Sequence, residues 1–210
     1  HDFDNIFQEL EDIKKYGFET IFIGDDTFAC NHERTINFCN EYINRKINLP
    51  WTSNLRVADV DLDRLKMMKK AGAYRVFVGF ESFNSTTMDA YNKNISFENS
   101  LKAANIIRSA GLEIHGSFMI GGPGDTKESL LAMIPLIKKL NPTIVTFNKV
   151  FAWSGTAFGK DPEKFGLYYT EDEFWFERDS WANRHPFYTK TMTPEDVNDV
   201  AKELYFEFLS

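Results

Sequence analysis

Short apolar segments typical of β-strands alternate with amphipathic helical segments through the first 150 residues, and this alternation constrains the fold most. Strands rich in β-branched and aromatic residues are predicted at Thr20–Ile23, Leu49–Asn54, Tyr74–Phe80, Leu112–Ile120 and Thr143–Val150. Helical periodicity covers Phe3–Ile13, Glu33–Arg45, Asp61–Gly72, Ser96–Ala110 and Thr126–Leu140. Parallel strands need a crossover of about a dozen residues or more, which each of these helices supplies. The pattern therefore predicts an α/β fold with a parallel sheet.

Both an open doubly wound sheet and a β/α barrel fit this order of elements. Polar or glycine residues stand at the carboxyl ends of the predicted strands, at Asp25–Asp26, Ser53–Asn54, Glu81–Ser82, Gly121–Gly124 and Asn148–Lys149. In a barrel these ends converge on one mouth, whereas in an open sheet only those at the switch point meet. The pattern favours the barrel.

Composition excludes several classes of protein. The 210 residues carry 24 Lys and Arg against 31 Asp and Glu, a net charge of −7, so nucleic acid is an unlikely partner. The two cysteines, Cys30 and Cys39, form no disulfide framework, and their spacing fits no zinc or iron–sulfur signature, so we expect no metal site. Since the sequence shows neither a signal peptide nor an apolar stretch of roughly 20 residues, we expect a cytoplasmic protein without a membrane span.

Both ends of the chain depart from the alternation. The chain begins with a helix and residue 1 is His, so we expect a fragment that has lost the first strand of its repeat. Residues 151–192 mix aromatic and charged residues without a clean period, and a final helix begins at Thr193–Pro194. We therefore divide the chain into a partial barrel, residues 1–167, and an aromatic-rich extension, residues 168–210.

Acidic residues at two strand ends are candidates for ligand binding. Because Asp25 and Asp26 are adjacent, at most one faces the mouth; the pair can anchor the loop or bind an ammonium or hydroxyl group. Glu81 follows a nearly continuous apolar strand, where a carboxylate must be solvated or paired. It can bind hydroxyl or amine groups, or form a salt bridge with Arg56 or Lys93.

The segment Gly121-Gly122-Pro123-Gly124-Asp125-Thr126 lies between a predicted strand and a predicted helix. Its glycines would let a flat or anionic ligand approach backbone amides, and the following helix N-terminus favours negative charge. The segment is neither a P-loop nor G-x-G-x-x-G, so a structural turn and a ligand-binding loop fit it equally well. The histidines are scattered singly, although strand alternation allows His115 to face the barrel lumen.

Five motifs follow one another in order along the chain. They are Phe22-Ile23-Gly24-Asp25-Asp26-Thr27-Phe28; Trp51 ahead of Arg56; Ala71-Gly72 leading into Val78-Gly79-Phe80-Glu81-Ser82; Gly116 to Thr126; and Ser154-Gly155-Thr156 before Gly166-Leu167. Over about residues 1–167 this series resembles the radical S-adenosylmethionine (radical SAM) enzymes. The resemblance is strongest to the group usually fused to a cobalamin-binding domain, which includes anaerobic magnesium-protoporphyrin monomethyl ester cyclases and several methyltransferases.

The resemblance implies a partial (βα)6 TIM-like barrel, of which this chain supplies five strands and lacks the first. It implies a [4Fe–4S] cluster held by the thiolates of a C-x-x-x-C-x-x-C loop, with S-adenosylmethionine on the open iron. Reductive cleavage then gives a 5′-deoxyadenosyl radical, which abstracts hydrogen from a small-molecule or modified-cofactor substrate. The implied partners are a flavodoxin or ferredoxin type of reductant, and cobalamin in an upstream domain.

The resemblance also assigns residues to S-adenosylmethionine, and no catalytic residue. Gly24, Asp25 and Asp26 match the segment that cradles the methionyl amine, and Ser53 ends the next strand. Glu81 and Ser82 match the strand end near ribose and carboxylate. Ile120, Gly121, Gly122, Pro123 and Gly124 match the loop against the adenine, and Asn148 is a further lumen residue.

The sequence departs from the family where the iron is bound. It contains no C-x-x-x-C-x-x-C motif and no D-x-H-x-x-G cobalamin motif, so the fragment alone is expected to be inactive. Residues Ala152–Thr156 also lack the proline that relatives commonly have before Gly-Thr.

Two alternatives stay open: a β/α barrel that binds a phosphorylated small molecule through the Gly121–Thr126 loop, and a non-catalytic binding module. Polar strand ends argue against the second.

Overall fold

A five-stranded sheet forms the centre of the fold. The computed structural model describes residues 2–93, 95–153, 155–169 and 187–210. The strand order is β1-β2-β3-β4-β5, and β1, β2 and β3 pair in parallel, as the alternation predicts. These strands are β1 Ile21–Ile23, β2 Trp51–Arg56, β3 Ala73–Glu81, β4 Glu113–Ile120 and β5 Ile144–Lys149; β6 Tyr168–Tyr169 and β7 Phe187–Tyr188 form a separate antiparallel pair.

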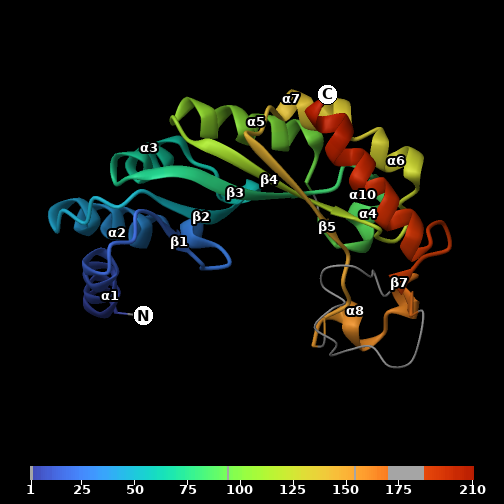
Figure 1. Ribbon diagram of the computed structural model, residues 1–210, viewed down its shortest axis with the longest axis horizontal. Helices are drawn as coiled ribbons and strands as arrows, with labels where there is room; N and C mark the ends of the chain where they lie inside the picture. The colour runs from blue at the N-terminus through green and yellow to red at the C-terminus, as the bar shows by residue number, and fades with distance from the viewer. Residues whose placement is uncertain (1, 94, 154, 170–186) are drawn as a thin grey trace. The chain divides into compact units, whose positions relative to one another are not determined.

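Helices separate the consecutive strands of the sheet (Figure 1). The α-helices are α1 Phe3–Lys15, α2 His32–Asn44, α3 Leu62–Lys70, α4 Ser85–Ala90, α5 Phe97–Ser109, α6 Lys127–Leu131, α7 Ile134–Leu140, α8 Ala157–Lys160 and α10 Pro194–Leu209. Short 3-10 helices are η1 Phe28–Cys30, η2 Val57–Asp59 and η3 Glu163–Phe165. Among the described residues, no helix is both long and apolar enough to cross a membrane.

The chain divides into two compact units. The first contains the residues up to Phe80, 98–116 and 141–144, and the second contains 81–97, 117–140 and 145–210. The first unit therefore holds α1 to α3, α5 and the strands β1 and β2, with β3 up to Phe80. The second holds α4, α6, α7, α8 and α10, with β4 from Ser117 on and β5 from Val145 on. The division at residue 167 stays a prediction.

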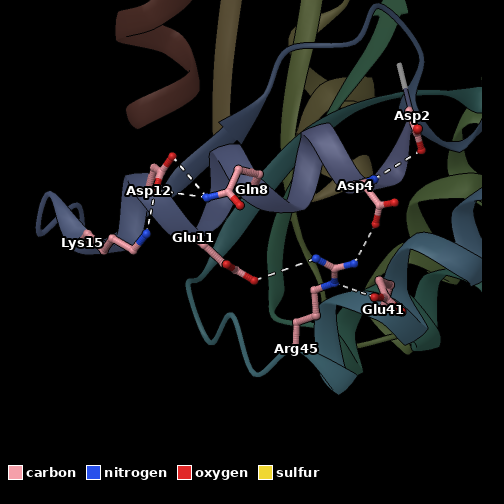
Figure 2. Close-up of polar contacts among 8 residues, drawn as sticks. All are labelled: Asp2, Asp4, Gln8, Glu11, Asp12, Lys15, Glu41 and Arg45. Carbon is pink, nitrogen blue, oxygen red and sulfur yellow. Dashed lines mark hydrogen bonds and ion pairs between the residues drawn. The ribbon is translucent and has the colours of Figure 1, made fainter.

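Aromatic packing and one arginine join α1 to α2 in the first unit. The rings of Phe7 and Phe38 stack with centroids 5.3 Å apart, and both side chains are buried. Arg45 follows α2 and donates to Asp4 of α1 at 3.0 Å and to Glu41 of its own helix at 2.5 Å (Figure 2). An aromatic core thus holds the helix pair, and the partly exposed ion pairs add little by comparison.

Side chains of β3 alternate between two environments. Val76 and Val78 are fully buried, whereas Arg75, Phe77 and Gly79 are only half-buried. Since successive strand residues point to opposite faces, one face packs in the core and the other is open.

The second unit is organised around α10, which packs beside α6 and α7 (Figure 1). Val197, Val200 and Leu204 of this helix are each 1% exposed. Thr193 caps α10 through a reciprocal capping box with Asp196, and Pro194 occupies its first turn, as predicted. The C-terminal helix is therefore part of this unit's core.

The structure corrects two expectations about helices. The single helix predicted over Thr126–Leu140 is two helices, because Pro135 has no N–H to continue the hydrogen-bond ladder from α6 into α7. The helix α4 was not expected at all, although its N-cap Asn84 accepts from the amide of Thr86. Residues 151–192, which show no clean period in sequence, contain α8, η3 and the β6–β7 pair, and residues 170–186 lie outside the described part.

Candidate functional site

The first unit places Gly24, Asp25 and Asp26 directly after β1, and all three are exposed. The side-chain amide of Asn54 in β2 donates to the backbone carbonyl of Asp25 at 3.0 Å. This bond ties the two strand ends together and leaves the carboxylates of both aspartates in contact with solvent. They are therefore able to bind an ammonium or hydroxyl group of a ligand.

Ser53 lies on the opposite face of β2 from Asn54. Its side chain is fully buried, on the same side as the core residues Trp51 and Leu55. Its hydroxyl has no hydrogen-bond partner in the described part of the chain. Asn54 rather than Ser53 therefore lies on the half-exposed side of the strand.

Three rings meet on the open face of the sheet in the first unit. The ring of Phe22, 55% exposed, lies edge-on to Phe77 at 5.3 Å, and Phe77 stacks on His115 at 4.2 Å. Burial, with a smaller effect of the nearby Arg75, lowers the pKa of His115, so its imidazole is neutral near pH 7. His115 thus shares the half-exposed face of β4, the orientation that strand alternation allows.

A mainly apolar pocket of about 280 Å³ also belongs to the first unit. It is lined by residues of α1, β1 and α2, among them Ile6, Leu10 and Phe38, and also by Asp25. The strand β1 stands at the end of the sheet order, so among the described residues only one of its edges is paired. The sequence pattern did not indicate this pocket.

In the second unit, Glu81 ends β3 with a positive φ of 66°, a conformation that is strained for a residue with a side chain. Its carboxylate is an ion-pair partner of Lys93, and its side chain is 15% exposed. Of the two salt bridges considered from sequence, the structure forms the one with Lys93, while Arg56 pairs with Asp59 at 2.6 Å. Glu81 is therefore a fixed, charge-balanced carboxylate at a strand end.

The glycine segment is held by its own buried aspartate. Asp125 accepts hydrogen bonds from the amides of Gly122, at 2.9 Å, and Gly121, and from the hydroxyl of Thr87 at 2.6 Å. The side-chain amide of Asn84 donates to Gly124 O at 3.0 Å and to Asp125 at 3.3 Å. Burial raises the pKa of Asp125, and these hydrogen bonds oppose the shift. The residues of α4 and its cap thus fix the loop.

Two glycines of this loop are required by their surroundings. A Cβ on Gly124 would lie 2.5 Å from the methyl of Thr86, and its φ of +84° disfavours any other residue. A Cβ on Gly122 would lie 2.2 Å from the hydroxyl oxygen of Tyr91. The α4 segment therefore packs directly against the backbone of the loop.

The remaining predicted residues of the second unit differ in what they offer a ligand. Ser82 is buried, and its hydroxyl accepts from Asn84 N at 3.1 Å. Ile120 is a core residue whose carbonyl accepts from Val150 N at 2.9 Å. Asn148 is exposed and donates to the Ser117 hydroxyl at 2.8 Å. Only Asn148 among these three presents a side chain to solvent.

Sequence reasoning missed the residues that shape the glycine loop from outside it. Asn84 and Thr87 lie about 40 positions upstream of the loop, and Thr191 donates its hydroxyl to Asp125 O from 66 positions downstream. No local pattern predicts such contacts. The Asn84 cap was the one available signal, because an Asn before Ser-Thr-Thr marks a helix start.

With this architecture, the chain belongs to the radical SAM superfamily, whose family model matches residues 1–137. An uncharacterized methyltransferase of Pyrococcus horikoshii is 30% identical over 157 residues, which are 74% of this chain and 34% of the relative. The anaerobic magnesium-protoporphyrin IX monomethyl ester cyclase of Rubrivivax gelatinosus is 24% identical over 143 residues, 67% of this chain and 26% of the relative. This chain thus spans about a third or less of these relatives.

A solved structure supports the same fold. The radical S-adenosylmethionine methyltransferase TsrM of Kitasatospora setae, with cobalamin and a [4Fe–4S] cluster bound, matches with a TM-score of 0.69. The match covers 83% of this chain and 37% of TsrM at 16% identity. The five-stranded sheet with its helices is therefore the TIM-like partial barrel of this superfamily, as the sequence predicts.

The residues present do not fit an iron–sulfur cluster. The sequence has two cysteines, whereas the family motif supplies three thiolates. Cys39 is buried, which raises the pKa of its thiol to about 12, and Cys30 is exposed. Within the described residues, no three His, Cys, Asp or Glu side chains are grouped to hold a metal ion.

Proposed function

We propose that this chain is the S-adenosylmethionine-binding core of a radical SAM enzyme of the methyltransferase or cyclase kind. The family match, and relatives named for both activities, support this proposal. The count of two cysteines and the limited coverage of the relatives suggest that cluster ligands lie outside these 210 residues. A cobalamin domain elsewhere in the full-length protein is proposed on the same basis, since TsrM binds cobalamin.

The hydrogen bonding of the glycine loop is the observation that best supports the proposal, because it distinguishes a phosphorylated ligand from the adenine of S-adenosylmethionine. A phosphate-binding loop needs free backbone amides aimed at the anion. Here the amides of Gly121 and Gly122 already donate to the carboxylate of Asp125, and a second anion beside it would be repelled. The anchored loop instead suits a flat, uncharged ring such as adenine, so it argues against a phosphorylated ligand.

The proposed assignments concern each unit by itself. In the second unit, Glu81 would bind hydroxyl groups of the ribose, and the loop from Gly121 to Gly124 would lie against the adenine. In the first unit, the exposed Asp25 and Asp26 would bind the methionyl amine. When bound to the full-length protein, S-adenosylmethionine would supply radical chemistry, and the residues of this chain would hold and orient the molecule.

Calorimetric titration of S-adenosylmethionine into the full-length, cluster-reconstituted protein tests these assignments. Asp26→Ala and Glu81→Ala are each expected to weaken binding about 10-fold or more, because each removes a charge-assisted hydrogen bond. Asp63→Ala, an exposed acid on α3, and Glu113→Ala, which pairs with Arg75, are matched controls. Unchanged affinity in both test variants would refute the assignments.

The resemblance to the family supports a proposal for the substrate and partners. We propose a small-molecule or modified-cofactor substrate, a flavodoxin or ferredoxin type of reductant, and a location in the cytoplasm. Turnover by the full-length protein with a flavodoxin, and none with the 210-residue chain alone, is the expected result.

A further inference from the structure

Tyr91, which follows α4, carries a buried hydroxyl that has no hydrogen-bond partner within the described part of the chain. A buried polar group without a partner destabilises the folded state, so such groups are rare in folded proteins and call for an explanation. Neither the sequence motifs nor the family resemblance assigned a role to this residue.

The position of the Tyr91 hydroxyl is fixed from two sides. Its ring packs against Phe158 with centroids 5.9 Å apart, and against the buried cluster of Val150, Ala152 and Leu167. The hydroxyl end meets Gly122, where only the absence of a Cβ leaves room for it. Rotation of the ring away from the loop would disrupt the apolar cluster, so the hydroxyl remains directed at the glycine loop.

Two carboxylates influence this hydroxyl without bonding to it. Burial, with the nearby charges of Asp125 and Glu81, raises the pKa of Tyr91, so the phenol keeps its proton. The acceptor atoms of Asp125 are taken up by Thr87, Asn84 and the loop amides. A protonated hydroxyl thus lies against Gly122 of the glycine loop, under the influence of the Glu81 charge and with its donor unused.

We propose that Tyr91 is a further binding residue for the adenosyl part of S-adenosylmethionine, to which its hydroxyl donates a hydrogen bond. The inference rests on the proposed function, because the hydroxyl lies against the loop assigned to adenine and is influenced by the charge of Glu81, which is assigned to ribose. An acceptor on the adenosyl group satisfies the hydroxyl, which offsets the cost of its burial when the ligand binds.

The variant Tyr91→Phe separates this role from a structural one. Phenylalanine keeps the ring contacts and removes only the hydroxyl. In the full-length, cluster-reconstituted protein, we expect the variant to bind S-adenosylmethionine about five- to 20-fold more weakly. Without the ligand, its midpoint of thermal unfolding should stay level or rise by about 2–4 °C, because an unpartnered polar group is gone.

Ser100→Ala is the matched control, because Ser100 on α5 in the first unit also has a buried hydroxyl without a partner among the described residues. It should raise the unfolding midpoint and leave the affinity unchanged. Gly122→Ala gives a second test, since its Cβ would displace the Tyr91 hydroxyl. With Tyr91→Phe added, the hydroxyl oxygen 2.2 Å from that Cβ is gone, and the nearest atom is Cζ of the ring at 3.0 Å. The double variant should therefore be more stable than Gly122→Ala alone.

The outcomes distinguish the two proposals. If the wild-type protein fails to bind S-adenosylmethionine, the proposed function fails. If the wild type binds and Tyr91→Phe binds within twofold of it, the function stands and the role of Tyr91 is overturned. A lower unfolding midpoint of Tyr91→Phe also overturns it, because the hydroxyl would then be bonded within the protein.

Discussion

Asp125 holds the glycine loop, so its replacement by alanine is expected to destabilise that loop more than any other single change there. Two of its partners keep other acceptors: Thr87 also donates to Pro123 O at 3.2 Å, and Asn84 to Gly124 O. The amides of Gly121 and Gly122 have Asp125 as their acceptor. Asp125→Ala therefore leaves two buried N–H groups unpaired.

The expected cost follows from that count. Each unpaired buried donor costs about 1–3 kcal/mol, and removal of a buried carboxylate returns part of this, so the net destabilisation should be about 2–4 kcal/mol. Urea unfolding measures the free energy, and hydrogen exchange of the Gly121 and Gly122 amides reports the loop itself. A loss below about 1 kcal/mol, with both amides still protected, would refute the account of the loop.

The pH dependence of the same carboxyl gives an independent check. Burial raises the pKa of Asp125, so the folded protein retains this proton to a higher pH than the unfolded chain. The contribution of this group to the free energy of unfolding therefore falls as the pH rises above the ordinary value of 3.8. Relative to Asp125→Asn, the wild type should lose stability in that direction, and an opposite slope would contradict the burial argument.

Three further predictions concern stability. Gly124→Ala should lower the free energy of unfolding, measured with denaturant, by about 1–3 kcal/mol. Adding Thr86→Ala should restore only part of this loss, because the positive φ of residue 124 remains. Full restoration would show that the contact between the new Cβ and Thr86 causes the whole loss. Burial lowers the pKa of His115, so the wild type should lose stability relative to His115→Phe as the pH falls below about 6.5. Denaturant unfolding at several pH values measures this difference. Parallel plots of unfolding free energy against pH for the two proteins would contradict the prediction. Arg45→Met should cost about 1 kcal/mol or less, and less at high salt, whereas a salt-independent loss would mean that Arg45 acts through packing.

The strands and most helices could be predicted because their signals are local. The run from Tyr74 to Phe80 is apolar enough to identify β3, and Thr193–Pro194 starts α10 as expected. Pro135 also indicated a break between α6 and α7, but the apolar spacing on both sides of this proline suggested one continuous helix. Local patterns therefore give the elements and less often their interruptions.

The candidate site was only partly predictable, because strand ends are visible in sequence and side-chain environments are not. Glu81 was expected to be paired or solvated, and it is paired with Lys93. Ser53 was selected by its position, yet its side chain lies in the core. The contacts of Asp125 and Tyr91 with α4 depend on segments that meet only after folding. These contacts supply the anchoring on which the proposed adenosyl site depends.

An experimental structure of the full-length protein with S-adenosylmethionine bound tests the central claim most directly. We expect the adenosyl group to lie against the Gly121–Gly124 backbone, with Glu81 and the Tyr91 hydroxyl within hydrogen-bond distance of it. An adenosyl group bound elsewhere, for instance in the pocket between α1, β1 and α2, with the glycine loop free of ligand, would contradict the account.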